Sequence, residues 1–163
     1  ELWDVYDADR CPTGRLHRRA EPMGEGEFHL VVYAWIRGGD GRYLLTKRSP
    51  NKGYPNMWEC TGGSALTGDD SLTAALREVR EETGLRLDPM RGRRVASHKV
   101  TGRFEDVWLF ERDVALGELT LQEGETCGAM LARADEILEL RREGKLAPTG
   151  SFELAELLRL MEG

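Results

Sequence analysis

Residues 63–85 read GSALTGDDSLTAALREVREETGL, the most informative stretch of the chain. Asp69, Asp70 or Ser71 can cap the start of a helix, and Gly84 stands where a helix commonly ends. With about 3.6 residues per helical turn, one arc collects four apolar residues: Leu72, Ala75, Leu76 and Val79. The stretch therefore predicts a glycine-containing turn followed by an amphipathic helix that packs on a sheet.

Three carboxylates form a second arc of this helix, directly beside the apolar arc: Glu78, Glu81 and Glu82. Like charges three or four residues apart cost roughly 0.2–0.5 kcal/mol per pair. Acids near a helix C-terminus also meet an unfavourable dipole, by roughly 0.3–1 kcal/mol each. A solvated face with local salt bridges is one interpretation. A site for Mg²⁺ or Mn²⁺ is the other, and it is favoured because convergent carboxylates supply the oxygen ligands that these cations prefer.

The rest of the chain predicts strands before and after this helix, then two more helices. Strands are expected in residues 2–7, 28–37 and 42–48 and on both sides of a turn at residues 101–102, with helices at 134–144 and after a Ser151 cap. This order predicts an α/β fold with a mixed β-sheet flanked by helices. We expect one domain over residues 1–163, with 1–26 as an N-terminal β-hairpin extension and 151–163 as a C-terminal helix.

Composition limits the classes of partner. The chain has 163 residues, 40% hydrophobic and 32% charged, as is typical of a globular protein. A net charge of −6 argues against a nucleic acid polymer or a membrane surface as partner, but allows a small phosphorylated substrate. Cys11, Cys60 and Cys127 are widely spaced, which favours free thiols. With no signal-peptide pattern at the start, we expect a cytoplasmic protein.

Residues 63–85 also resemble a known family signature, the Nudix box G-x5-E-x7-R-E-U-x-E-E-x-G-U, in which U is aliphatic. Eight of its nine specified positions match, and the exception is Asp69, where the family has Glu. The resemblance to MutT-like Nudix hydrolases implies an α/β/α sandwich. It also implies Mg²⁺-dependent (or Mn²⁺-dependent) hydrolysis of a small diphosphate, a nucleoside diphosphate linked to another group. Dimers are common in the family, so a homodimer is one option.

The resemblance assigns roles to the residues of the box. Glu78, Glu81 and Glu82 would hold the metal together with the carbonyl of Gly63. One of these carboxylates or a further glutamate would deprotonate the attacking water. Arg77 would orient the carboxylates through salt bridges. Asp69 is one methylene shorter than the family's glutamate, which leaves its pairing with Arg77 open.

Several residues outside the box are candidates for the same site. Lys47 and Arg48 end a predicted strand and would bind phosphate, unless they are solvated strand-end charges. The further glutamate would be Glu123 or Glu125, or else Glu105 in the predicted turn after the box. Two aromatic residues, Trp58 and Tyr54, would either anchor a loop or stack on a base.

The N-terminal half is similar to the Nudix subgroup that lies near isopentenyl diphosphate isomerase. That enzyme needs a cysteine followed by Gly-His, seven residues before the box glutamate. Gly62 occupies the position here, followed by Gly63-Ser64, and Cys60 lies two positions away. His29 matches one metal-ligand position of the isomerases, although a lone strand histidine is also a common structural residue. Hydrolase is therefore the favoured prediction, with an isomerase-like enzyme and a non-catalytic nucleotide-binding module as alternatives.

Overall fold

The computed structural model describes residues 1–163 and contains a mixed seven-stranded sheet with three α-helices. Along the sheet the order is β5-β4-β3-β8-β7, while β6 pairs with β3 and β9 pairs with β4. The main strands are β3 (His29–Arg37), β4 (Tyr43–Arg48), β5 (Trp58–Glu59), β6 (Thr61–Ser64), β7 (Gly92–Val100), β8 (Arg103–Glu111) and β9 (Thr126–Ala132). The helices are α1 (Ser71–Thr83), α2 (Ala134–Arg142) and α3 (Leu154–Glu162), with short 3-10 turns at Pro89–Arg91 and Leu116–Glu118.

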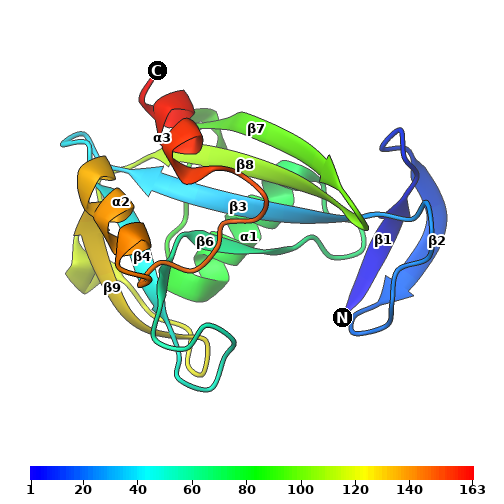
Figure 1. Ribbon diagram of the computed structural model, residues 1–163, viewed down its shortest axis with the longest axis horizontal. Helices are drawn as coiled ribbons and strands as arrows, with labels where there is room; N and C mark the ends of the chain where they lie inside the picture. Colours follow the sequence, from blue (N-terminus) through cyan, green and yellow to red (C-terminus); the bar gives the residue numbers. More distant parts are fainter.

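Strand β3 runs through the centre of the sheet and positions the rest (Figure 1). It pairs in parallel with β8 over its whole length and antiparallel with β6, where Val32 lies opposite Gly63. A parallel pair needs a long crossover connection, and the segment that contains α1 lies within it. The sheet therefore holds Gly63, the first residue of the Nudix-box resemblance, beside the central strand β3.

Two hydrophobic clusters lie on opposite faces of the sheet, because alternate residues of β3 point to opposite sides. Val32, Ala34 and Ile36 belong to the cluster that packs on Ala74, Ala75 and Val79 of α1. On the other face, Trp35 joins the cluster formed with α2 and α3 (Figure 1). The predicted α/β/α sandwich is confirmed, as is the burial of Ala75 and Val79, while Leu72 and Leu76 are only half-buried.

The N-terminal segment forms a separate two-stranded hairpin, β1 (Leu2–Tyr6) and β2 (Pro12–Arg18), beside one end of the sheet (Figure 1). Its turn is tied to the sheet by Arg10, whose Nη1 donates to Oδ1 of Asp106 at 2.8 Å. Asp106 is fully buried on β8 and also accepts from Ser71 Oγ at 2.6 Å and Ser97 Oγ at 2.7 Å. Burial opposes ionisation, but these hydrogen bonds and the Arg10 charge outweigh it and lower the pKa of Asp106.

The C-terminal helix differs from the prediction at its start. Helix α3 begins at Leu154, and Glu153 is its N-cap, with a side chain that accepts from the amides of Ala155 and Glu156. Ser151 is not the cap, because its hydroxyl donates to Glu105 Oε1 at 2.6 Å. None of the helices has the length and apolar character needed to cross a lipid bilayer.

Candidate active site

A cavity of about 540 Å³ opens beside the C-terminal half of α1. Its walls come from α1, β6, the loop after β4, the loop before β9 and residues 147–149. Seven of the predicted catalytic, metal-binding and phosphate-binding residues line it: Arg48, Gly63, Arg77, Glu78, Glu81, Glu82 and Glu125. The structure therefore brings the whole predicted carboxylate cluster to one cavity, together with residues far away in the sequence.

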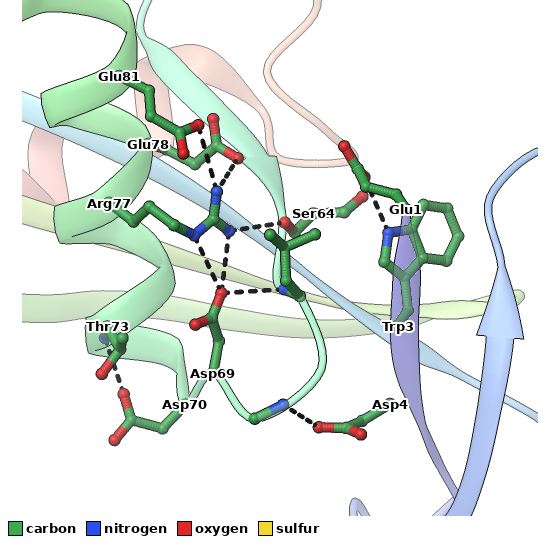
Figure 2. A network of polar contacts seen from close by, with 12 residues as sticks. Glu1, Trp3, Asp4, Ser64, Asp69, Asp70, Thr73, Arg77, Glu78 and Glu81 are labelled. Carbon is green, nitrogen blue, oxygen red and sulfur yellow. Dashed lines mark hydrogen bonds and ion pairs between the residues drawn. The ribbon is translucent and has the colours of Figure 1, made fainter.

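Arg77 lies at the centre of a polar network that joins α1 to the loop before it (Figure 2). Its Nη2 donates to Oδ2 of Asp69 at 2.9 Å and to the carbonyl of Ser64 at 3.2 Å. Its Nη1 donates to Glu78 Oε1 at 3.2 Å and to Glu81 Oε2 at 3.3 Å. One guanidinium thus orients two of the three clustered glutamates, as predicted. The shorter Asp69 does reach Arg77, which settles the question that the sequence leaves open.

The backbone of Gly63 lies close to the carboxylate of Glu78. A Cβ atom at Gly63 would collide with the Glu78 carboxylate. The Glu78 side chain is largely buried, and this burial raises its pKa to about 7, even though the neighbouring Arg77 charge lowers it. The side chain of Glu81, by contrast, is 44% exposed.

Glu82 is the most perturbed carboxyl group of the cluster. Burial raises its pKa to about 9, and the nearby charges of Glu78 and Glu59 add to the rise. The Lys52 charge opposes it only in part. A buried carboxyl beside two others is unstable as an anion unless a cation compensates it, so the electrostatics of this corner favour a bound cation.

The donor set fits a hard divalent cation, since it consists of carboxylate oxygens beside a glycine backbone. No three Asp, Glu, His or Cys side chains already surround one point at ligand distance. Two of the clustered glutamates instead bond to Arg77. A cation would therefore have to compete with the guanidinium for Glu78 and Glu81.

The predicted phosphate-binding cations separate in the structure. Arg48 lines the cavity, but its Nη1 donates to both carboxylate oxygens of Glu59, at 2.9 and 2.7 Å. Lys47 does not line the cavity, and its Nζ lies 5.7 Å from the centroid of the Trp58 ring. Lys47 instead lines a smaller hollow beside the cavity, together with Glu82 and Glu125, so its role in phosphate binding stays a prediction. The residue in its place is Lys52, which lines the cavity and pairs with Glu125.

The candidates for a further glutamate are also separated. Glu125 lines the cavity, whereas Glu123 is exposed and lies outside it. Glu105 is not in a turn but in β8, fully buried and outside the cavity wall, so the expectation of a site residue there is corrected. Its register opposite Val31 of β3 puts its side chain on the same face of the sheet as Val31, which lines the cavity, but Gly150 and Ser151 lie against its carboxylate.

The aromatic candidates and His29 have clear positions. Tyr54 lines the cavity and is exposed, while Trp58 packs against the core and Lys47. His29 stacks on Trp3 at 4.0 Å between ring centroids and lies outside the cavity. Burial and the Arg103 charge lower its pKa to about 4, so it stays neutral at pH 7. These contacts support the structural interpretation of His29.

Other residues of the cavity escaped sequence reasoning: Tyr33, Lys52, Glu59, Gln122 and Thr149. Lys52 and Gln122 lie in turn-rich loops, where polar residues are common and carry no periodic signal. Tyr33 lies in a strand that is largely buried on both faces. The sequence of such a strand does not show which of its residues lines a cavity. Thr149 is 66 residues beyond the box helix, and only the tertiary fold brings it there.

Comparisons with known proteins agree with this geometry. A sequence model of the NUDIX domain matches residues 27–152. An uncharacterized Nudix hydrolase of Listeria monocytogenes is 39% identical over 162 residues, which cover 98% of this chain and 95% of that protein. The isopentenyl-diphosphate Delta-isomerase of Shigella flexneri is 24% identical over 157 residues, 95% of this chain and 78% of the isomerase. The crystal structure of DR0079 from Deinococcus radiodurans superposes with a TM-score of 0.77 at 24% identity, covering 98% of both chains.

Proposed function

The chain belongs to the Nudix hydrolase family, and we propose that it is a Mg²⁺-dependent pyrophosphohydrolase acting on a nucleoside diphosphate derivative. The observation that carries the proposal is the joint presence of Gly63, Glu78, Glu81 and Glu82 on one cavity wall, with Arg77 bound to two of the glutamates. Mn²⁺ is the alternative cation, since the same oxygen ligands suit it.

The reaction is the attack of water on one phosphorus of the diphosphate. A phosphorus–oxygen bond to the leaving phosphate breaks, and a proton of the water passes to a carboxylate of the cavity. A divalent cation bound by the glutamates would neutralise charge on the diphosphate and acidify a nearby water molecule. Arg77 fixes the orientation of Glu78 and Glu81, while Glu125, near Glu82, is a candidate proton acceptor.

Two cationic side chains of the cavity are candidates for binding the phosphate groups. They are Lys52, which is paired with Glu125, and Arg48, which is paired with Glu59. An incoming phosphate could replace Glu125 as the partner of Lys52, because Glu125 is the more exposed carboxylate. Replacing Glu59 as the partner of Arg48 is harder, because Arg48 contacts both oxygens of that carboxylate. We therefore propose Lys52 as the main phosphate-binding cation, with Arg48 in support.

The test is metal-dependent phosphate release by the purified protein from nucleoside diphosphates, nucleoside diphosphate sugars and dinucleotides. We expect turnover with Mg²⁺ and none with excess chelator. Product analysis in ¹⁸O-labelled water would show which phosphorus is attacked. Absence of turnover on every compound, with a folded protein and both cations, would contradict the proposal.

The isomerase alternative rests on the similarity to isopentenyl-diphosphate isomerases. Gly62 stands where their cysteine would be needed, and it carries no acid or base. Cys60 lines the cavity, but burial raises the pKa of its thiol well above the usual range, so it stays protonated at pH 7. Isomerisation of isopentenyl diphosphate without phosphate release would favour this alternative over hydrolysis. Ligand-induced stabilisation without any turnover would favour a nucleotide-binding module.

A further inference from the structure

Two aromatic side chains line the cavity, Tyr33 and Tyr54, and they are held differently. The ring of Tyr33 lies against Gly62 and Gly150, because a Cβ atom at either glycine would come within 2.9 Å of it. The Tyr33 hydroxyl donates to Glu105 at 3.4 Å. Tyr54 is 56% exposed and belongs to neither hydrophobic cluster. Of the two rings, that of Tyr54 is therefore the one left free for a ligand.

Tyr54 also has a backbone conformation that its residue type disfavours. Its φ is 51°, in the left-handed region that glycine and asparagine adopt readily. For other L-residues this region is strained, and strained residues gather at functional sites. Since the ring packs in neither cluster, the core gains nothing from a tyrosine at this position. A contact with a ligand explains why a tyrosine stands there.

The loop that carries Tyr54, residues 49–57 between β4 and β5, is itself well fixed. Arg48 Nε donates to the carbonyl of Gly53 at 2.6 Å. The amide of Ser49 donates to the carbonyl of Glu125 at 3.1 Å, which ties the loop to the one before β9. Figure 1 shows the two loops projecting from the sheet next to each other. Tyr54 is thus presented in a defined position, so little ordering is needed when a ligand binds.

The surroundings of Tyr54 indicate which part of a substrate it meets. Lys52, the cation proposed for phosphate, shares the smaller hollow beside the cavity with Glu82 and Glu125, and Tyr54 is not part of that hollow. Tyr54 follows Lys52 by two residues, which span at most about 7 Å. The face of an aromatic ring is negative and does not attract a phosphate. A flat base stacks on it favourably. The exposed ring therefore suits the end of a nucleotide that points away from the phosphates.

We propose that the ring of Tyr54 stacks on the base of the substrate and so selects diphosphates that carry a base. The phosphates then lie at Lys52 and the glutamates, and the base lies at the rim of the cavity. Stacking tolerates any base, because every base has a π-face. Tyr54 thus determines that a base is required, and not which base. This inference rests on the proposed function, because it assumes that a nucleoside diphosphate occupies the cavity.

The test compares wild type with Tyr54→Phe, which keeps the ring, and with Tyr54→Leu, which is apolar but has no ring. We measure kcat/KM with ADP, GDP, CDP and UDP, and with ribose 5-diphosphate, which has no base. In wild type, the best nucleotide should exceed ribose 5-diphosphate by about tenfold or more. Tyr54→Phe should keep this ratio. Tyr54→Leu should lower it by about tenfold, through a higher KM for the nucleotide.

Two kinetic results would overturn the inference and leave the hydrolase proposal intact. One is an unchanged ratio in Tyr54→Leu, which would show that the ring makes no contact with the base. The other is an equal loss in Tyr54→Phe and Tyr54→Leu, which would assign the contact to the hydroxyl and not to the ring.

A thermal melt without ligand separates this role from a structural one. Tyr54→Asn should melt at or above the wild-type temperature, because asparagine adopts a positive φ more readily and the lost ring packs in neither cluster. It should lose the preference for nucleotides as Tyr54→Leu does. A melting temperature several degrees lower would assign Tyr54 to the structure of the loop and overturn the inference.

If wild type hydrolyses none of the five compounds, the hydrolysis of nucleoside diphosphates fails as a proposal, and binding decides the inference. The dissociation constants of the same compounds are then measured by calorimetry with Ca²⁺. Tighter binding of a nucleotide than of ribose 5-diphosphate, kept in Tyr54→Phe and lost in Tyr54→Leu, would support stacking. Failure of wild type to bind any nucleotide would overturn it.

Discussion

Asp69 and Arg77 are joined by two hydrogen bonds, from Nε and Nη2 of the arginine to Oδ2 of the aspartate, at 3.2 and 2.9 Å. The same Oδ2 accepts from the amide of Leu66 at 2.9 Å. The carboxylate thus joins the start of the loop to the guanidinium that orients Glu78 and Glu81 (Figure 2). The shorter side chain does not weaken the site by failing to reach its partner.

Asp69→Asn should disturb this arrangement without changing the shape of the residue. Loss of the charged pair, which is mostly buried, should lower the free energy of unfolding by about 1–3 kcal/mol. It should also lower kcat/KM by about tenfold, since Arg77 then orients the glutamates less firmly. Denaturant unfolding and steady-state kinetics measure the two effects. Asp70→Asn is the matched control, because Asn caps helices as well as Asp does. Equal effects of the two variants would show that Asp69 has no special role.

Glu82→Gln should separate metal binding from folding. Without metal, burial and the charges of Glu78 and Glu59 raise the pKa of Glu82 to about 9, so its carboxyl is already neutral at pH 7 and the amide should leave the melting temperature unchanged. With Mg²⁺ or Mn²⁺, the variant should lose the cation-induced rise in melting temperature, and its kcat should fall by about a hundredfold or more. The exposed Glu123→Gln serves as control and should behave like wild type. Full turnover of Glu82→Gln at limiting Mg²⁺ would refute the metal assignment.

Lys52→Met and Lys47→Met test which lysine serves the substrate. Lys52 lines the cavity and Lys47 does not, so only Lys52→Met should weaken a phosphate contact. We expect its KM to rise about tenfold, the effect of one charged hydrogen bond, and the KM of Lys47→Met to change less than twofold. The salt dependence of KM should fall in Lys52→Met as well. A larger effect at Lys47 would favour the original prediction from sequence.

Gly63→Ala should be damaging for a steric reason. The added methyl group meets the carboxylate of Glu78, which is the end of a flexible side chain, so this carboxylate must move from its place beside Arg77. Activity should fall by at least tenfold, even where the protein remains folded by circular dichroism. Gly117→Ala has open space around the new methyl group and is the control. Normal kinetics in Gly63→Ala would show that Glu78 has no fixed position.

Asp106 should make stability depend on pH at the acid end. Its folded-state pKa lies below the usual value, so its contribution is complete above the unfolded value of about 3.9. This contribution to stability is lost as the pH falls through the unfolded-state pKa and then through the lower folded-state pKa of Asp106. Arg10 and Arg94 are the cations that face it. Asp106→Asn should lower the free energy of unfolding by roughly 3 kcal/mol at pH 7, and the difference should shrink below pH 4. The exposed Asp135→Asn should have little effect at any pH.

Much of the fold was predictable because its signals are local. The apolar arc of α1, the three candidates for its cap and its Gly84 end all lie within one stretch. The structure confirms the helix and its Gly84 end, and it selects Asp70 as the cap. The strong apolar strand at residues 28–37 and the turn at residues 101–102 are equally local. The start of α3 was missed because the hydroxyl of Ser151 has a better partner in Glu105, 46 residues earlier.

The site was predictable only where the family signature extends. The carboxylate wall follows from helical spacing, but the opposite wall depends on which loop residues face inward. Lys47 and Lys52 are both lysines at the end of the same predicted strand and loop, so the sequence does not distinguish them. The pairing of β4 with β5 and β9 determines that Lys52 lines the cavity and Lys47 does not. Thr149 and Glu105 depend on contacts between distant segments, which no pattern in the sequence marks.

The Arg10–Asp106 contact has a consequence for where the protein can be cut. The NUDIX match begins at residue 27 and ends at residue 152, and a fragment with those limits would lack both Arg10 and α3. It would bury the Asp106 carboxylate without its two-bond contact to Arg10, next to the Ser71 that begins α1, and leave only the longer contact to Arg94. It would also uncover the core face that Leu154, Leu157, Leu158 and Met161 fill. We therefore expect the smallest fragment that folds by itself to be longer than residues 27–152, and to need both ends of the chain.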